Sequence, residues 1–286
     1  MCSSDLENHF LMTTTTGGAA RVLGWMERWV QTEWPQMQVY MTSVTDQWST
    51  FAVVGPQSRA VVAKVCQDVD LSNAAFPFMS WRAGTVAGVP ARIMRISFSG
   101  EMSFEINVPS NCGEHVWKAL MAAGKQAGIT PYGTEAMHVL RAEKGYIIVG
   151  QDTDGSITPI DLGMGGMVAK NKDFLGRRSL SRSDTARTDR KQLVGLLTDD
   201  PQLVLPEGGQ LTEQAQASAP PVPMLGHVTS SYFSATLQRS IAMALVRNGQ
   251  RRVGQKVYAA LEDGRYVACT VGSTVFYDPQ GKRLHA

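Results

Sequence analysis

The residues whose types and spacing could do chemistry are concentrated in one stretch, LRAEKGYIIVGQDTDG, from Leu140 to Gly155. Glu143 and Lys144 lie here within an otherwise apolar run, and Tyr146 follows closely. A carboxylate in such a neighbourhood is either solvated on a turn or held in a cleft for a ligand, because an unpaired charge is costly to remove from water. An ionised carboxylate can accept two N–H donors side by side, so Glu143 is a candidate ligand-binding group.

Other polar patterns are explained better by structure than by chemistry. Asp152 and Asp154 are spaced like the start of a calcium loop, but the closing Glu is missing, so a polar turn is favoured. His115 and His138 lie on expected helices without a second ligand one turn away, which favours structural histidines over a metal site. No pattern places a His–Asp pair near Thr229, Ser230 and Ser231, which argues against a nucleophilic serine.

The elements that position these residues can be read from hydrophobic spacing. A helix is expected over 133–145, ended by Gly145, directly before the apolar run that contains Tyr146. Upstream, the pattern predicts a helix over 111–129 ended by Gly124 or Gly128, and strands over 91–97 and 104–108 joined by a turn at 99–101.

The N-terminal third adds further elements. The run HFLMTTTTGGAARVL predicts a strand, a turn and the start of an amphipathic helix over 19–32, with the four threonines supplying its N-cap. Two strands, over about 38–44 and up to Val54, then precede a helix that begins near Gly55 and Pro56. Strands and helices mix without a strict β-α-β rhythm, which favours an α+β fold.

The C-terminal third has a different character. The polar stretch from Arg177 to Lys191 is typical of an exposed connector, and five short apolar runs follow it between Gly, Pro and Asp turns. Such spacing predicts a small β-barrel or sandwich of about a hundred residues. The expected domains are therefore residues 9–185 and residues 190–286.

Composition excludes several classes of protein. The 286 residues are 43% hydrophobic and 18% charged, with a formal net charge of +2, so neither a nucleic-acid surface nor disorder is indicated. Four scattered cysteines form no C-x-x-C pair and suggest reduced thiols in a cytoplasmic protein without a metal site. No run reaches the about 20 apolar residues that a membrane-spanning helix needs.

Several separated blocks resemble the glycine-cleavage aminomethyltransferase (T-protein) family of folate-binding proteins. The family pattern has an LR-x-E-x-G helix end, a G-x-D segment, an R-x-x-L-V-G-L strand and a G-x-x-T-S hairpin, and the chain matches each in order. Within the family, the blocks MTTTTGGAARVL, SNAAFPFMSWR, RISFSGEMSFEINVP and AEKGYIIVGQDTDG resemble the alpha subunits of heterotetrameric sarcosine oxidases, in their C-terminal folate-binding region. The resemblance runs from His9 to the end.

This resemblance implies an α+β cloverleaf around a tetrahydrofolate site, truncated at its N-terminus and closed by the small β-barrel. It implies that flavin-dependent oxidation of sarcosine supplies a one-carbon unit that is captured as 5,10-methylenetetrahydrofolate, with glycine and hydrogen peroxide as co-products. The partners would be a flavin-bearing beta subunit and small subunits, with FAD or FMN and NAD bound only on other parts of the complex.

The resemblance also assigns roles to residues. Glu143 matches the pterin-binding carboxylate, and Arg190 matches an arginine that meets an anionic part of folate; a solubilising connector residue is an equal alternative for Arg190. Tyr132, Tyr146 and Phe104 are candidates for an aromatic slot, or else simply core, and Tyr146 is preferred because it adjoins Glu143.

Two family features have no counterpart in the sequence. The upstream G-x-G-x-x-G loop is absent, and the family's catalytic aspartate corresponds to a strand before the first residue, so the catalytic group is unknown. The chain is accordingly expected to begin inside a domain. Two alternatives stay open: a non-catalytic module that docks on a flavin subunit, and a free-standing aminomethyltransferase.

Overall fold

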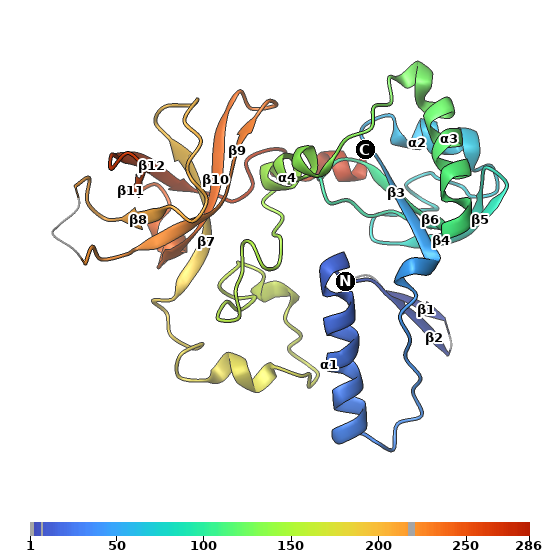
Figure 1. Cartoon of the computed structure of the whole chain (residues 1–286), viewed down its shortest axis with the longest axis horizontal. Helices are drawn as coiled ribbons and strands as arrows, with labels where there is room; N and C mark the ends of the chain where they lie inside the picture. Colours follow the sequence, from blue (N-terminus) through green and yellow to red (C-terminus); the bar gives the residue numbers. More distant parts are fainter. Residues whose placement is uncertain (1–2, 7, 217–220) are drawn as a thin grey trace. The chain divides into compact units, whose positions relative to one another are not determined.

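The computed structural model describes residues 3–6, 8–216 and 221–286. It divides into two compact units, coloured along the chain in Figure 1. Unit 1 comprises Met1–Ser97, Glu101–Pro131 and Arg283–Ala286, and unit 2 comprises Phe98–Gly100 and Tyr132–Lys282. These two units are groups of residues whose Cα atoms pack together in space. The sequence-based division into residues 9–185 and 190–286 stays a prediction.

Unit 1 is built on a four-stranded antiparallel sheet with the strand order β3-β6-β5-β4. The strands are β3 (Trp48–Val54), β4 (Trp81–Val86), β5 (Val89–Met94) and β6 (Ser103–Pro109). The predicted pairing of the segments before and after the turn at 99–101 is confirmed, with Ile93 opposite Ile106. Strand β4, which was not predicted, extends the sheet beside β5.

Two helices cover one face of this sheet, α2 (Ser58–Val65) and α3 (Gly113–Gly124). Phe104, Ile106 and Val108 alternate along β6 and form one buried cluster with valines of both helices. Helix α3 ends at Gly124, one of the two predicted stops, and Gly128 follows a short 3₁₀ turn in the left-handed conformation, with φ of 71°.

The N-terminal part was predicted only in part. Helix α1 (Ala19–Thr32) has the predicted bounds, and β2 (His9–Met12) pairs with β1 (Ser3–Leu6). The threonine N-cap was wrong, because a 3₁₀ turn over Thr16–Gly18 places Gly18 at the cap position. The strand expected over 38–44 was also wrong: this segment is irregular, Tyr40 is 95% exposed, and no described residue pairs with it in a sheet.

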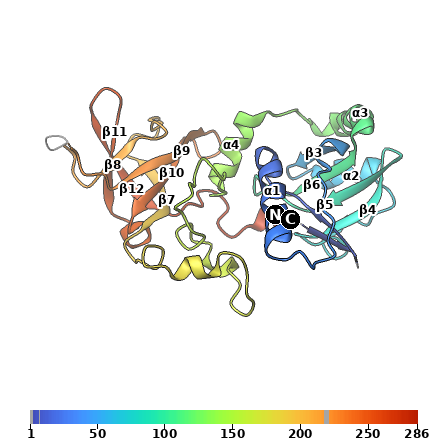
Figure 2. The same ribbon diagram turned by 60° about the horizontal axis from the view of Figure 1, so that its bottom comes forward.

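Unit 2 contains a closed barrel of six strands with the order β10-β7-β12-β11-β8-β9 (Figures 1 and 2). Its strands are β7 (Lys191–Thr198), β8 (Gln210–Thr212), β9 (Gly226–Ser234), β10 (Arg239–Arg247), β11 (Lys256–Ala260) and β12 (Tyr266–Gly272). The five longer strands were predicted. Strand β8 was missed because its three residues are too few to display a periodic pattern.

Strand β10 is buried on both faces, which explains its almost continuous apolar sequence. Ala242, Ala244 and Val246 belong to the barrel interior. Ile241, Met243 and Leu245 belong to a second cluster outside the barrel that includes Ala142 of α4 (Thr134–Glu143). The barrel therefore carries α4 on its outer surface, and the α+β fold class is confirmed.

The described residues include three free cysteines, Cys66, Cys112 and Cys269, whereas Cys2 lies outside them. Burial raises the pKa of the Cys66 and Cys269 thiols to about 11, so both are protonated at neutral pH. Within the described ranges, no helix is both long and apolar enough to span a membrane.

Candidate functional site

Glu143 is the last residue of α4, and its side chain is enclosed. The residue is only 3% exposed, and Ser234 Oγ at the end of β9 donates a hydrogen bond of 2.6 Å to Glu143 Oε1. The Glu143 carbonyl oxygen accepts from the backbone N–H groups of Phe276 and Tyr277, each at 2.9 Å. Both the main chain and the carboxylate of Glu143 are therefore held from the barrel side.

Gly145 ends the helix, as predicted, with φ of 69°. The Gly145 N–H donates to the carbonyl of Ala142 at 2.9 Å, and the Tyr146 N–H donates to the carbonyl of Arg141 at 3.0 Å. A Cβ at position 145 would lie 2.6 Å from the carbonyl oxygen of Thr274. Only glycine satisfies both the left-handed conformation and this close approach, so the sharp turn after Glu143 depends on it.

Lys144 is turned to a different partner from Glu143. Its Nζ donates to the carbonyl oxygen of Asp278 at 2.7 Å and to Asp278 Oδ2 at 3.2 Å, and its side chain is 5% exposed. Two adjacent charges in an apolar run are thus separately satisfied: the cation by Asp278 and the carboxylate by Ser234.

Tyr146 forms an aromatic pair with Phe98, with ring centroids 6.3 Å apart and planes inclined by 30°. Burial raises the pKa of the Tyr146 phenol, and the negative charge of Asp278 raises it further. The ring is therefore neutral and presents a flat apolar surface three residues after Glu143.

The other two aromatic candidates have different surroundings. Tyr132 is 44% exposed and lies two residues before α4 begins. Phe104 is fully buried in the core of unit 1, where its ring packs edge-on against Phe76 with centroids 5.9 Å apart. Phe104 thus has the core role that was its alternative.

Arg190 is not a solvated connector residue. Its side chain is 9% exposed and forms ion pairs with Asp161 at 2.9 Å and with Asp184 at 2.6 Å. The hydrogen bonds with Asp161 are the main reason that the pKa of Arg190 is raised. Asp161 is itself buried, whereas the side chain of Asp184 is 65% exposed. The role of Arg190 toward a ligand stays a prediction.

A buried ion pair between Arg141 and Asp152 was not predicted from the sequence. Both side chains are 0% exposed, and Arg141 Nη1 lies 2.5 Å from Asp152 Oδ2. The other oxygen, Asp152 Oδ1, accepts from the hydroxyls of Thr229 and Ser230, each at 2.6 Å. Asp152 is therefore a structural anchor inside the fold, and its turn is not a solvated one.

The signal for this pair was present in the sequence. Arg141 and Asp152 are the arginine of LR-x-E-x-G and the aspartate of G-x-D, two of the blocks that matched the family pattern. Ser230 is occupied by this network, which accounts for a polar hairpin without assigning a nucleophile. Within residues 3–6, 8–216 and 221–286, no three His, Cys, Asp or Glu side chains are grouped as they would be around a metal ion.

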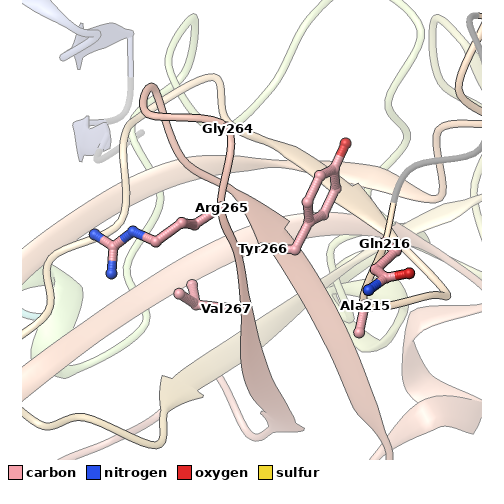
Figure 3. Close-up of a pocket in the computed structure, with 6 residues that line it drawn as sticks. All are labelled: Ala215, Gln216, Gly264, Arg265, Tyr266 and Val267. Carbon is pink, nitrogen blue, oxygen red and sulfur yellow. The ribbon is translucent and has the colours of Figure 1, made fainter.

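A surface hollow occurs elsewhere in unit 2, beside the turn between β11 and β12 (Figure 3). It is lined by Ala215, Gln216, Gly264, Arg265, Tyr266 and Val267. None of the residues predicted to hold a ligand belongs to this lining.

The fold and the barrel define the class of protein. The structure is similar to the crystal structure of glycine cleavage system aminomethyltransferase T from Bartonella henselae, with a TM-score of 0.78 and 24% identity, over 94% of this chain and 69% of that one. At this identity the likeness establishes the aminomethyltransferase-like fold alone.

The sequence then gives the family. Residues 2–172 match the GCVT N-terminal domain, and residues 191–278 match the glycine cleavage T-protein C-terminal barrel domain. The chain belongs to the glycine cleavage T-protein family.

Several named proteins have sequences similar to that of this chain. The chain is 53% identical over 279 residues to sarcosine oxidase subunit alpha of Corynebacterium sp. (strain U-96), covering 97% of this chain and 29% of the relative. It is 42% identical to the subunit of the same name from Rhizobium meliloti, covering 98% and 28%. It is 30% identical to human mitochondrial dimethylglycine dehydrogenase, covering 96% and 31%. The chain thus spans less than a third of the length of these relatives.

Proposed function

We propose that this chain is the folate-binding part of a sarcosine oxidase alpha subunit. In this role it binds tetrahydrofolate, which takes up the one-carbon unit of oxidised sarcosine and leaves as 5,10-methylenetetrahydrofolate. The methyl carbon of sarcosine is oxidised at a flavin on a partner subunit, dioxygen is reduced to hydrogen peroxide, and glycine is released. The 53% identity to a sarcosine oxidase alpha subunit over 97% of this chain favours this function over that of a free-standing aminomethyltransferase.

The buried carboxylate of Glu143 is the single observation that carries the proposal. A pterin ring presents a ring N–H and an exocyclic amine side by side, and a carboxylate accepts both in a paired fork. Ser234 donates a hydrogen bond to the Glu143 carboxylate, and the neighbouring Lys144 is engaged by Asp278. A carboxylate enclosed in protein is well suited to strong charge-assisted hydrogen bonds, because little water competes for it.

The aromatic residues support the same ligand. Tyr146 is neutral, as the raised pKa of its phenol requires, and its ring lies against Phe98. Flat rings such as a pterin or a p-aminobenzoyl group pack well on such surfaces. Tyr132, half-exposed just before α4, is proposed as a further contact. The chemistry assigned to these residues is binding and orientation, and the transfer step has no assigned residue.

Arg190 is proposed to meet an anionic part of the folate. Its planar guanidinium is suited to carboxylates, as its contacts with Asp161 and Asp184 demonstrate. The remaining features of the complex are proposed from the alpha-subunit relatives: a cytoplasmic heterotetramer with a flavin-bearing beta subunit and small subunits, and with FMN, FAD and NAD outside this chain.

Calorimetric titration of the full chain with tetrahydrofolate under anaerobic conditions tests the proposal. Binding should be measurable and should weaken in Glu143→Gln by roughly 10-fold or more, because a hydrogen-bond pair to a charged group contributes about 1.5–3 kcal/mol. Glu135→Gln is the matched control, since Glu135 is an exposed glutamate in the first turn of the same helix.

Two results would contradict the proposal at different levels. A folded chain that does not bind tetrahydrofolate would exclude the folate-binding function. Binding that is equally strong in the wild type and in Glu143→Gln would retain the function and remove Glu143 as the pterin anchor.

A further inference from the structure

Ser234 donates a side-chain hydrogen bond to the Glu143 carboxylate, and the two residues are 91 positions apart in the sequence. Ser234 is the last residue of β9 and is completely buried. Its hydroxyl oxygen lies 2.6 Å from Glu143 Oε1, a short distance that is typical of an O–H donor on a charged acceptor.

The direction of this hydrogen bond is fixed by a second one. The backbone N–H of Leu237 donates to Ser234 Oγ at 3.0 Å. A serine hydroxyl has one proton and two acceptor positions. Because Leu237 fills an acceptor position, the hydroxyl proton of Ser234 is available to the carboxylate, which can only accept. Ser234 is therefore a donor to Glu143, pre-oriented by the backbone of the β9–β10 turn.

Other residues fix the position of α4 on β9. Ser230, Tyr232 and Ser234 alternate along β9, so their side chains lie on one face of the strand. Arg141 Nη2 donates to Ser230 Oγ at 2.6 Å and contacts the Tyr232 hydroxyl at 3.4 Å. The Glu143 main chain is held by Phe276 and Tyr277. Loss of the Ser234 hydroxyl should therefore free the Glu143 carboxylate and leave the helix in place.

We propose that Ser234 is a positioning residue for the pterin-binding carboxylate. By occupying one acceptor position on Oε1, it fixes the rotation of the carboxylate and directs the other acceptor positions toward the pair of N–H donors on the ligand. The inference rests on the proposed function, because it assigns to Ser234 a role that it can exert only through Glu143.

The test is the affinity of the full chain for tetrahydrofolate in Ser234→Ala, measured by calorimetry. We expect the dissociation constant to rise about 10-fold, the effect of losing one charge-assisted hydrogen bond. Ser240→Ala is the matched control: Ser240 is a buried serine of the neighbouring strand β10, and its hydroxyl has no hydrogen-bond partner among the described residues. Its removal should leave the dissociation constant unchanged.

A double-mutant cycle separates positioning from general stability. In the Glu143→Gln background the acceptor at position 143 is neutral, and hydrogen bonds to neutral groups are about half as strong as charge-assisted ones. The added effect of Ser234→Ala should therefore be much smaller than in the wild-type background. An equal factor in both backgrounds would show that Ser234 acts through the fold, and would overturn the inference.

The outcomes also separate this inference from the proposed function. If Glu143→Gln weakens binding and Ser234→Ala does not, only the role of Ser234 is refuted. If Ser234→Ala fails to fold, as judged by circular dichroism, Ser234→Cys provides the same test, because a thiol takes the place of the hydroxyl and is a weaker donor. Affinity of Ser234→Cys equal to that of the wild type would contradict the role.

Discussion

The Arg141 guanidinium and the Asp152 carboxylate lie 2.5 Å apart with both side chains 0% exposed, and they join α4 to the segment that follows it. In the part of the chain that the structure describes, the charge of each is compensated by the other and by neutral donors and acceptors such as Ser230 and Tyr232. A buried pair of this kind is costly to break, because the remaining charge has no water to solvate it.

Asp152→Asn should destabilise the fold strongly. The substitution keeps the size of the side chain and leaves the Arg141 cation without a counter-charge, so we expect the free energy of unfolding to fall by about 3–5 kcal/mol. Urea denaturation followed by circular dichroism measures this change. Arg265→Gln is the control, since its ion pair with Asp263 is exposed and should contribute less than about 1 kcal/mol. Similar losses in both variants would refute the anchoring role.

Gly145→Ala should destabilise the chain more than Gly150→Ala does. Both glycines have positive φ, 69° and 97°, so both substitutions place a Cβ in an unfavourable backbone conformation. That conformation alone costs about 1–2 kcal/mol. At Gly145 the new Cβ would also meet the Thr274 carbonyl at 2.6 Å, whereas at Gly150 no atom of the described residues beyond the two chain neighbours lies within 4 Å.

The comparison of these two variants isolates the steric contact. Urea denaturation should give a larger loss of unfolding free energy for Gly145→Ala, and tetrahydrofolate affinity should fall in that variant alone, because the turn sets the main chain after Glu143. Equal losses from the two substitutions would mean that Thr274 moves aside without cost.

Hydrophobic spacing and helix-ending glycines predicted the helices whose bounds depend on neighbouring residues alone. Helix α1 has its predicted bounds because its apolar spacing is regular over fourteen residues, and α4 ends where Gly145 supplies a left-handed turn. The segment over 38–44 failed for the opposite reason. Its β-branched and aromatic residues are typical of a strand, but a strand requires a partner for its backbone, and the four-stranded sheet ends at β3.

The type of binding group in the candidate site was predictable from the sequence, but its hydrogen-bond partners were not. The sequence identified Glu143 as a charge in apolar surroundings, but its partner Ser234 is 91 residues away and is brought to it by the packing of α4 on the barrel. The ion pair between Arg190 and Asp161 was not predicted either. Asp161 lies 29 residues before Arg190, and no sequence motif marks it as a partner. Contacts set by tertiary packing leave no periodic signal in one sequence.

Acid should destabilise unit 2 partly through His227 on β9. Burial lowers the pKa of His227 below its usual 6.5, the charge of Lys191 lowers it further, and Asp154 opposes this. The unfolded chain therefore binds the proton more readily than the folded one. The contribution of His227 to the free energy of unfolding is fully present above its usual pKa and is lost as the pH falls below about 6.5.

His227→Gln should remove this part of the pH dependence. Urea denaturation between about pH 8 and pH 5 should give a shallower decline in unfolding free energy for the variant than for the wild type. The two curves should differ most at the acid end, where His227 is protonated in the unfolded wild type. Parallel curves would show that His227 protonates equally well in the folded chain.

Asp184→Ala should strengthen tetrahydrofolate binding if Arg190 meets an anionic part of the ligand. Asp184 is the exposed one of the two carboxylates on Arg190, lying 2.6 Å from Nη1, so it occupies a donor that the ligand would use. Removing an exposed competitor of this kind is worth about 0.2–1 kcal/mol, or up to about fivefold in the dissociation constant.

Asp189→Ala is the matched control for this prediction. Asp189 lies on the same connector and carries the same charge, but it pairs with Arg187 and not with Arg190. Both substitutions remove one negative charge, so a general electrostatic effect would strengthen binding equally in the two variants. A gain confined to Asp184→Ala would support a direct role for Arg190, because only that substitution releases its guanidinium. An unchanged dissociation constant in Asp184→Ala would indicate that Arg190 serves the fold alone, through its buried pair with Asp161.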